Sequence, residues 1–196
     1  MKIIGITGGT GSGKTTLLDA IARRGGCVVD CDAVYHDLLT TNSQMLQEIS
    51  DRFPGTVAHG ELNRKKLSAI VFHDKQALLD LNAITHRYVI EKTKAILQSS
   101  GAPLGAIDAI ALFESGLNRL CDVTVCVTAP EEARVLRLMQ REQIPADRAK
   151  ARIAAQRKDA EFSAWCDYTL KNSATKEEFT RQCHALLDII CKGEPL

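Results

Sequence analysis

The sequence has almost no net charge and no long apolar run. Its 25 Lys and Arg residues are balanced by 24 Asp and Glu residues, so the formal net charge is +1. This balance gives no broad electrostatic reason to expect binding to nucleic acid or to a membrane surface. No segment approaches the ~18 consecutive apolar residues of a membrane-spanning helix. We therefore expect no nucleic acid and no membrane among its partners, and the sequence indicates no obligatory protein partner.

Cysteine patterns typical of metal sites are also missing. The seven cysteines are an odd number, with no C-x-x-C pair and no His at zinc-finger spacing. Residues 1–7 hold only a short apolar run, which is too brief for the core of a signal peptide. Reduced thiols in a cytoplasmic protein are the simplest interpretation. Of the 196 residues 45% are hydrophobic, so the chain has enough apolar residues for a core and fits one domain with insertions.

Five short apolar or β-branched runs alternate with helical patterns. The first two runs flank a helical stretch that Gly25 and Gly26 close in the manner of a C-cap. A strand, a helix and a strand in succession form a βαβ unit, whose two strands are parallel. The sequence therefore predicts an α/β fold with a helix at residues 14–24 and strands at 2–6, 27–30, 104–112, 123–128 and 167–171.

A helical insertion separates the second and third of these strands. Residues 33–101 contain no good strand pattern. Asn63 is a candidate N-cap for a helix at residues 64–72, and Asp74 is a candidate N-cap for a long helix pair. We expect this insertion to be entirely helical.

Two further helices are predicted after the fourth strand. Thr128 and Glu131 have the spacing of a capping box, and the helix that begins there is expected to run to about residue 143. Pro145 interrupts the pattern, and a second helix is expected at residues 147–165. The two helices would form a hairpin.

The strongest signal for function is a glycine-rich motif directly after the first strand. It reads Gly8-Gly9-Thr10-Gly11-Ser12-Gly13-Lys14-Thr15 and matches G-x-x-x-x-G-K-[ST] in full. Glycines let the backbone curl so that N–H groups face phosphate oxygens, and the following helix N-terminus favours an anion. Lys14 is expected to reach the β- and γ-phosphates and Thr15 to bind Mg²⁺. A plain strand-to-helix turn with an incidental Lys is the alternative.

A GTPase switch is not supported. No Asp in the chain has Gly three residues later, as the D-x-x-G switch requires. The run at residues 175–178 is Thr-Lys-Glu-Glu and lacks the Asp of a guanine-reading T-K-x-D. The motif therefore favours phosphoryl transfer over a conformational switch.

A kinase needs a carboxylate near the acceptor hydroxyl, and Asp32 is the candidate. Asp30-Cys31-Asp32 ends the second strand at the carboxyl edge of the sheet, where ligands of open α/β folds bind. We predict Asp32 to be the general base and a neighbour of the metal. Spacing favours equally that Asp32 caps the helix that starts at residue 33.

Cations for the moving phosphoryl group are available on the helical hairpin. Each helix carries a face of regularly spaced polar residues, which resembles a lid over phosphates, although most charge runs are solvated. Arg137 and Arg141 are the better candidates because their helix leaves the fourth strand, and Arg148 is expected to face solvent. The two faces consist of Arg134, Arg137 and Arg141, and of Arg148, Arg152 and Gln156.

Other polar residues have weaker signals. Asp108, inside an apolar strand, is a candidate second acid of the motif and should have a partner because an unpaired buried carboxylate is costly. Glu114 is expected to end the same strand and to face the acceptor. Residues of the helical insertion have alternative readings as helix surface, and those considered for the acceptor are His36, Arg64, Lys65 and His86.

Taken together, the motifs resemble the dephospho-coenzyme A kinase family in order and spacing. The resemblance covers residues 1 to about 175, and only the last helix lacks a motif. The segments that carry it are Thr7 to Thr16, Asp30-Cys31-Asp32-Ala33, Gly60-Glu61-Leu62-Asn63-Arg64, Val71-Phe72, Thr85-His86 and Leu112-Phe113-Glu114.

The resemblance implies a P-loop NTPase with a five-stranded parallel sheet, a helical acceptor-binding insertion and a helical lid. ATP with Mg²⁺ would phosphorylate the ribose 3′-hydroxyl of dephospho-coenzyme A. The implied division is a nucleotide-binding core at residues 1–35, 101–133 and 166–196, an acceptor domain at 36–100 and a lid at 134–165.

The resemblance also assigns residues. The expected catalytic residues are Lys14, Asp32, Arg137 and Arg141, and the metal is expected at Thr15 and Asp32. The acceptor is expected at His36, Arg64, His86 and Glu114. The nucleotide is expected at Gly9, Thr10, Gly11, Ser12, Gly13, Lys14, Thr15 and Thr16, with Asn172 beside the adenine.

The chain departs from the family pattern at four positions, none of which removes a catalytic group. The residues found there are Asn63, Arg87, Ile110 and Lys171, where the family usually has Asp, Pro, Pro and Asp. Two alternatives stay open: another P-loop kinase with a small hydroxyl acceptor, and a nucleotide-binding regulatory module without kinase activity.

Overall fold

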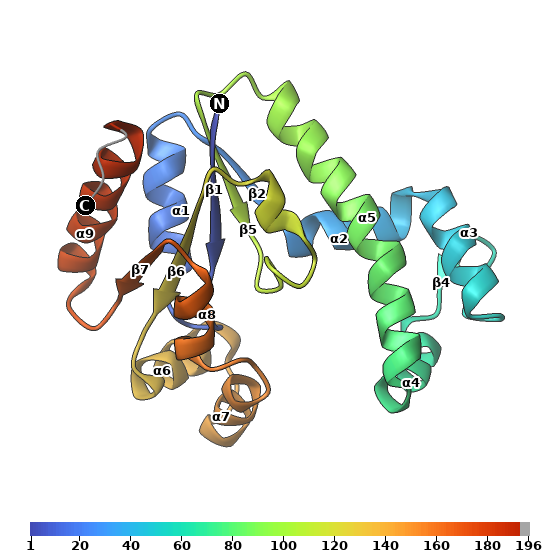
Figure 1. Ribbon diagram of the computed structural model, residues 1–196. Helices are drawn as coiled ribbons and strands as arrows, with labels where there is room; N and C mark the ends of the chain where they lie inside the picture. The colour runs from blue at the N-terminus through green and yellow to red at the C-terminus, as the bar shows by residue number, and fades with distance from the viewer. Residues whose placement is uncertain (193–196) are drawn as a thin grey trace. The chain divides into compact units, whose positions relative to one another are not determined.

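The structure is a computed structural model that describes residues 1–192. The chain divides into two compact units (Figure 1). The first unit, the core unit, comprises Met1–Val29 and Ser100–Leu196, and the second, the helical unit, comprises Asp30–Ser99. Each unit is described by itself.

A five-stranded sheet organises the core unit, in the order β2-β5-β1-β6-β7. The pairs β1–β5, β1–β6 and β6–β7 are all parallel. The predicted α/β fold with five strands is thus confirmed. The strands are β1 (Lys2–Thr7), β2 (Cys27–Asp30), β5 (Leu104–Asp108), β6 (Val123–Thr128) and β7 (Tyr168–Lys171).

One strand is shorter than its apolar run suggested. A strand over residues 104–112 was expected, but β5 ends at Asp108. Asp108 pairs with Ile6 and the neighbouring β1 ends at Thr7, so residues 110–112 would have no ladder partner on that side. Ala109 has no regular structure, and the apolar residues 110–112 are in turns, with Leu112 fully buried.

Two helices cover one face of the sheet. They are α1 (Lys14–Arg23) and α9 (Lys176–Lys192), which lie side by side in Figure 1. Alternate residues of the strands point toward them, as the two-residue period of a strand requires. The core formed there includes Ile4, Ile6, Val125, Val127, Leu17, Ile21, Phe179 and Leu187.

The opposite face of β1 is covered by the turn-rich segment that follows β5. The short helix η1 (Leu117–Leu120) contacts β1 there. A Cβ on Gly5 would lie 2.7 Å from the Cys121 sulfur and 2.9 Å from Leu112 Cδ2. Glycine at position 5 therefore lets this segment approach the strand.

The segment after β6 forms three helices: α6 (Glu131–Glu142), α7 (Ala146–Ala154) and α8 (Asp159–Trp165). Helices α6 and α7 share a small core made by Val135, Leu138, Ala149 and Ile153. The predicted capping box was wrong: Pro130 is the N-cap of α6, and no side chain caps this end. Thr128 instead ends β6.

The single helix expected at residues 147–165 was also wrong. The chain leaves the helical path after Ala154 and starts α8 at Asp159. Glu161 accepts a hydrogen bond from the Lys158 N–H at 3.0 Å, which satisfies a backbone donor at the start of a new helix.

The helical unit consists of α2 (Cys31–Thr41), α3 (Ser43–Arg52), α4 (Arg64–His73) and the long α5 (Lys75–Ser99). Helix α5 contacts each of the other three. The predicted N-caps are confirmed, since Asn63 accepts from the Lys66 N–H at 2.9 Å and Asp74 from the N–H groups of Gln76 and Ala77.

Two expectations for this unit were wrong. Residues 75–99 form one helix rather than a pair. A hairpin of β3 (Val57–Ala58) and β4 (Glu61–Leu62) also interrupts the helices, with His59 and Gly60 at φ values of 53° and 78° in its turn. Two residues per strand are too few to produce an alternating pattern.

Across the described residues, no helix combines the length and the apolarity that a bilayer crossing needs.

Candidate functional site

The glycine-rich motif forms a compact loop between β1 and α1. Gly8, Gly11 and Gly13 have φ values of 134°, 75° and 103°, in the region that L side chains rarely adopt. A Cβ on Gly8 would overlap the Val127 carbonyl oxygen, and one on Gly13 would overlap the Asn172 side-chain nitrogen. The loop therefore requires glycine both for its backbone and for close packing. We call residues 8–15 the P-loop.

Side chains from outside the P-loop bind its carbonyl oxygens. Arg134 Nε donates to the Thr10 oxygen at 2.9 Å, and Arg137 Nη1 donates to the Gly11 and Ser12 oxygens at 2.9 and 3.2 Å. Asn172 Nδ2 also donates to the Ser12 oxygen, at 2.8 Å. Three consecutive carbonyls thus turn toward cationic or amide donors.

This arrangement sets the direction of the P-loop amides. In a planar trans peptide the C=O and the next N–H point in opposite directions, and no cis peptide is present in the described chain. The N–H groups of Gly11 and Gly13 therefore point away from Arg134, Arg137 and Asn172. Outward amides beside the N-terminus of α1 form an anion-binding cradle.

Lys14 is the first residue of α1, directly after the glycines of the cradle. Its Nζ donates to the Gly8 oxygen at 3.0 Å and stands 4.0 Å from Asp108 Oδ1. The partner that Asp108 was expected to have is thus Lys14. Thr15 is exposed on the first turn of α1, and the buried Ser12 hydroxyl has no hydrogen-bond partner within residues 1–192. The P-loop therefore holds cationic and hydroxyl groups suited to phosphate oxygens.

The two arginines chosen from α6 differ in their surroundings. Arg137 is half-buried against the P-loop, and burial lowers the pKa of its guanidinium. Arg141 is exposed and donates to Glu142 at 2.7 Å. That hydrogen bond lowers the pKa of the Glu142 carboxyl. Arg148 is exposed, as expected.

Sequence reasoning underrated Arg134 and missed the role of Gln156. Arg134 is 5% exposed, and besides Thr10 it donates to Asp159 Oδ1 at 3.0 Å and to Gln156 Oε1 at 3.3 Å. Gln156 Oε1 also accepts the Thr10 N–H at 2.8 Å. The i, i+3 spacing of Arg134 and Arg137 was a signal for the first residue. The spacing also placed Gln156 on the second polar face, but it did not predict a contact with the Thr10 backbone.

Glu114 is not at the end of a strand. It lies in the turn beyond β5 and accepts from Arg157 Nε at 2.6 Å. The Arg157 guanidinium also stacks 4.7 Å from the centre of the Trp165 ring. Glu114 is thus joined to the segment around α8.

The remaining predicted residues lie in the helical unit. Asp32 and His36 are exposed on α2, Arg64 is exposed at the start of α4, and His86 is half-buried on α5. Arg64 acts on Tyr35 of α2: burial raises the pKa of that hydroxyl, and the charge of Arg64 partly opposes the shift. The structure thus brings Arg64 beside α2.

The capping alternative for Asp32 is wrong. Asp30 is the N-cap of α2, and its Oδ1 accepts from the Asp32 and Ala33 N–H groups at 2.9 and 3.0 Å. Asp32 stands in the first helical turn, and no hydrogen bond or ion pair of its carboxylate is found among residues 1–192. Its side chain is exposed.

The four departures from the family pattern have local roles. Asn63 caps α4, a role that Asp fills equally well. Arg87 pairs with Glu48, whose other oxygen accepts from Tyr88 at 2.7 Å. The Ile110 oxygen accepts from the Thr7 hydroxyl at 3.1 Å, a contact that needs only a backbone carbonyl.

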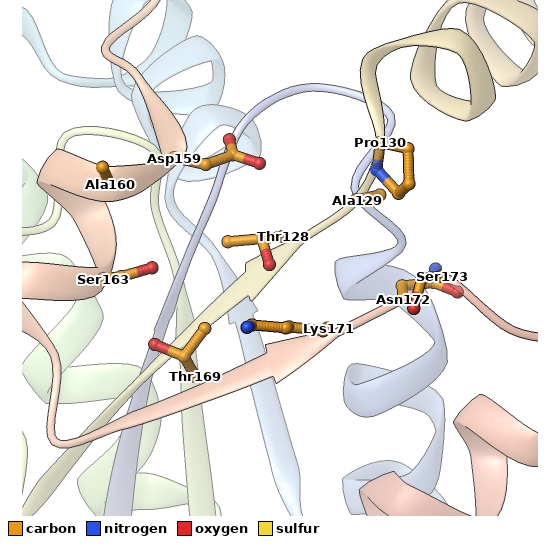
Figure 2. A pocket seen from close by; sticks show the side chains of 10 residues that line it. All are labelled: Thr128, Ala129, Pro130, Asp159, Ala160, Ser163, Thr169, Lys171, Asn172 and Ser173. Atoms are coloured by element: carbon orange, nitrogen blue, oxygen red, sulfur yellow. The ribbon is translucent and has the colours of Figure 1, made fainter.

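The fourth departure, Lys171, lines a pocket of 370 Å³ (Figure 2). The pocket lies between α8 and the ends of β6 and β7, on the sheet face opposite α1 and α9. Figure 2 shows the side chains of Thr128, Thr169 and Lys171 on that side. The rest of its lining is Ala129, Pro130, Asp159, Ala160, Ser163, Asn172 and Ser173.

Comparison with known proteins decides the family. A family model described as "Dephospho-CoA kinase" matches residues 2–178. The chain belongs to the dephospho-CoA kinase family. A dephospho-CoA kinase from Anaeromyxobacter dehalogenans is 36% identical over 192 residues, which cover 95% of this chain and 91% of that relative. The resemblance stated from the sequence is confirmed.

Solved structures agree with this family. A protein from Thermus thermophilus, 33% identical, has a TM-score of 0.78 and covers 95% of this chain and 96% of its own. A dephospho-CoA kinase from Campylobacter jejuni, 26% identical, has a TM-score of 0.67 and covers 100% of both chains. Membership of this family confirms a kinase with a nucleotide-binding P-loop.

Proposed function

We propose that the protein transfers the γ-phosphoryl group of ATP to the ribose 3′-hydroxyl of dephospho-coenzyme A. The P-loop carries this proposal, because its glycines, its outward amides and Lys14 together suit a polyphosphate. Membership of the dephospho-CoA kinase family supports the identity of the acceptor.

The transfer needs groups that bind the phosphates and groups that neutralise the charge of the transferred phosphoryl. The acceptor oxygen forms a bond to the γ-phosphorus while the bond from that phosphorus to the β,γ-bridging oxygen breaks, so ADP leaves. The amides of Gly11 and Gly13 and the Lys14 ammonium bind the phosphates. Arg137 and Arg141 are proposed to neutralise charge on the transferred group, and Asn172 to lie beside the adenine.

Asp32 is proposed to be the general base that accepts the proton of the acceptor hydroxyl. Its carboxylate is exposed at the start of α2, and the cap of that helix is supplied by Asp30 instead. A carboxylate with no hydrogen bond or ion pair in the described chain is suited to a transient contact with substrate.

The proposed metal ion would arrive with the nucleotide. Among residues 1–192 no three His, Cys, Asp or Glu side chains gather as a metal site. Mg²⁺ in kinases is held by one or two protein oxygens together with phosphates and water. Thr15 and Asp32 would supply those oxygens, and the ion would neutralise phosphate charge.

We assign the acceptor to the helical insertion and the closing element to residues 134–165, the lid segment. His36, Arg64 and His86 are the proposed acceptor contacts, with Glu114 from the core unit. Arg64 is exposed and cationic, which suits a phosphate of the acceptor. We expect Arg64→Ala to raise KM for the acceptor and to leave KM for ATP unchanged.

Coupled ADP release with a panel of acceptors tests the function. The panel holds dephospho-coenzyme A, nucleosides, nucleoside monophosphates and sugars, and the product is identified by mass. We expect ADP only with dephospho-coenzyme A, with coenzyme A as product. Equal ADP release with and without acceptor would favour a nucleotide-hydrolysing module, and preference for another acceptor would favour a different small-molecule kinase.

A further inference from the structure

Thr10 differs from its neighbours in the P-loop because side chains bind both of its backbone polar groups. Its N–H donates to Gln156 Oε1 at 2.8 Å, and its carbonyl accepts from Arg134 Nε at 2.9 Å. Both partners lie in the lid segment, more than 120 residues along the chain. Thr10 is 7% exposed, so water does not readily replace these partners.

One oxygen joins the two partners. Gln156 Oε1 accepts the Thr10 N–H and also accepts from Arg134 Nη2 at 3.3 Å. Arg134 is held in turn by Asp159 at 3.0 Å. Thr10, Gln156, Arg134 and Asp159 thus form one connected hydrogen-bond network, which we call the P-loop tie. In this network the Thr10 N–H and each of the three Arg134 guanidinium nitrogens meet an acceptor.

Little space is left between Arg134 of the P-loop tie and the backbone of the P-loop. A Cβ on Gly9 would overlap the Arg134 guanidinium, and a Cβ on Gly11 would lie 2.9 Å from the Arg134 carbonyl oxygen. The guanidinium therefore packs directly against the loop backbone. Its carbon stem enters from α6, while Gln156 approaches from the break between α7 and α8.

The direction of the Thr10 amide separates it from the phosphate-facing amides. The Thr10 N–H points to a protein oxygen, whereas the N–H groups of Gly11 and Gly13 point away from the side-chain donors that bind the outer carbonyls. An amide already paired with a protein oxygen is not needed by a phosphate. Its contribution is to hold the loop shape before the nucleotide binds.

We propose that Gln156 is a positioning residue for the P-loop: with Arg134 it holds both backbone groups of Thr10, so that the amides after Thr10 are preorganised for the phosphates of ATP. The inference rests on the proposed binding of ATP at this loop. It assigns to the break between α7 and α8 a role in nucleotide affinity. Preorganised donors need no rearrangement when ATP binds, and the avoided cost of rearrangement increases the affinity.

Amide hydrogen exchange of the wild-type protein gives the first test. Without nucleotide, the Thr10 amide should exchange more slowly than those of Gly11 and Gly13. ATP should then protect Gly11 and Gly13 and leave Thr10 nearly unchanged. Rapid exchange of Thr10 in the free protein, or strong protection of Thr10 by ATP, would overturn the proposal. Absence of any protection by ATP would instead contradict nucleotide binding at this loop, so the two failures are distinguishable.

Three variants give the second test. Gln156→Met has nearly the same volume without the amide oxygen, Gln156→Glu keeps an acceptor oxygen, and Gln140→Met makes the same change on the exposed side of α6. The measurements are ATP binding without acceptor, the exchange rate of the Thr10 amide, and kcat with KM for each substrate.

We expect Gln156→Met to weaken ATP binding and raise KM for ATP about tenfold, the scale of one lost hydrogen bond. The exchange of Thr10 should accelerate by a similar factor, with KM for the acceptor unchanged. Gln156→Glu should restore ATP binding to within about threefold of wild type, and Gln140→Met should match wild type. Wild-type ATP affinity in a folded Gln156→Met would overturn the proposal, and so would equal losses of ATP affinity in Gln156→Met and Gln156→Glu. If Gln156→Met does not fold, the hydrogen-exchange test on the wild-type protein decides between the outcomes.

Discussion

The first turns of α2 and α6 follow two strands of the same sheet, and their charged residues are used differently. At the start of α6, Arg134 is buried and makes contacts with Thr10, Gln156 and Asp159. At the start of α2, Asp30 caps the helix, whereas the Asp32 carboxylate is exposed and makes no hydrogen bond or ion pair in the described part of the chain.

The difference separates residues that support the site from residues that act on substrate. A side chain whose hydrogen-bonding groups are satisfied inside the protein contributes to stability and to loop geometry. An exposed charged side chain contributes little to stability. We therefore expect substitutions of Arg134 and Asp30 to change the melting temperature, and substitutions of Lys14, Asp32 and Arg141 to change turnover.

The largest effect is expected from Lys14→Ala. This change removes the cation at the phosphates and leaves the loop amides in place, so kcat should fall roughly 10³-fold with the circular dichroism spectrum unchanged. Lys150→Ala, on the exposed surface of α7, is the matched control and should match wild type. Activity of Lys14→Ala within a few-fold of wild type would show that phosphoryl transfer takes place elsewhere.

Asp32→Asn should come next, with a loss of roughly 10²-fold or more in kcat. The amide keeps the volume but cannot take the proton, while ATP should bind as before. Because Asp30 caps α2, the melting temperature should not change. The companion variant Asp30→Ala should show the reverse: a loss of about 1 kcal/mol in the free energy of unfolding and near-normal kcat.

Near-normal turnover of Asp32→Asn would remove this residue from the mechanism. The search for the acceptor-side carboxylate would then move to Asp108 and Glu114.

Arg134→Met should lower the free energy of unfolding by about 2 kcal/mol. The change leaves the Thr10 oxygen and the partly buried Asp159 carboxylate without a charged donor. Chemical denaturation measures this loss. Arg137→Met should lower the free energy of unfolding by less, because the Ser12 oxygen still accepts the hydrogen bond from Asn172. Equal stability of Arg134→Met and wild type would contradict a supporting role for the buried guanidinium.

The smallest effect is expected from Arg141→Met, where kcat should fall about tenfold with the free energy of unfolding unchanged within about 0.5 kcal/mol. Its side chain is exposed and pairs only with Glu142 in the described residues, so its loss removes no buried contact. Chemical denaturation and steady-state kinetics on the same sample measure the two effects. A stability loss as large as that of Arg134→Met would erase the distinction between the two ends of α6.

Much of the fold was predictable because its signals are local. The strands at residues 27–30 and 123–128 match the structure, and so do the caps at Asn63 and Asp74, since alternation and capping depend on neighbours within a few residues. The errors also have physical reasons. Strand β5 ends close to the end of its partner β1. The helix predicted at 147–165 is interrupted at Gln156, whose side chain accepts a hydrogen bond from the P-loop.

The candidate site also has a part that local sequence signals identify and a part that they do not. The motif at residues 8–15 identifies the P-loop, because phosphate binding there uses backbone groups whose geometry follows from glycine positions. The proposed roles of Asp32, His36, Arg64, His86 and Asn172 rest on the family resemblance and stay predictions. Asn172 does lie against the P-loop, through its bond to the Ser12 oxygen.

The sequence by itself determined the βαβ unit, the P-loop and the family, because each depends on residue types at short, regular spacing. Only the tertiary structure decided which arginines of α6 are buried and which residues hold the Thr10 backbone. Arg134 and Gln156 lie 124 and 146 residues from Thr10, and no local pattern encodes a hydrogen bond over such separations. Those contacts form when α6 and the break after α7 pack against the loop, and packing against the loop depends on the whole fold.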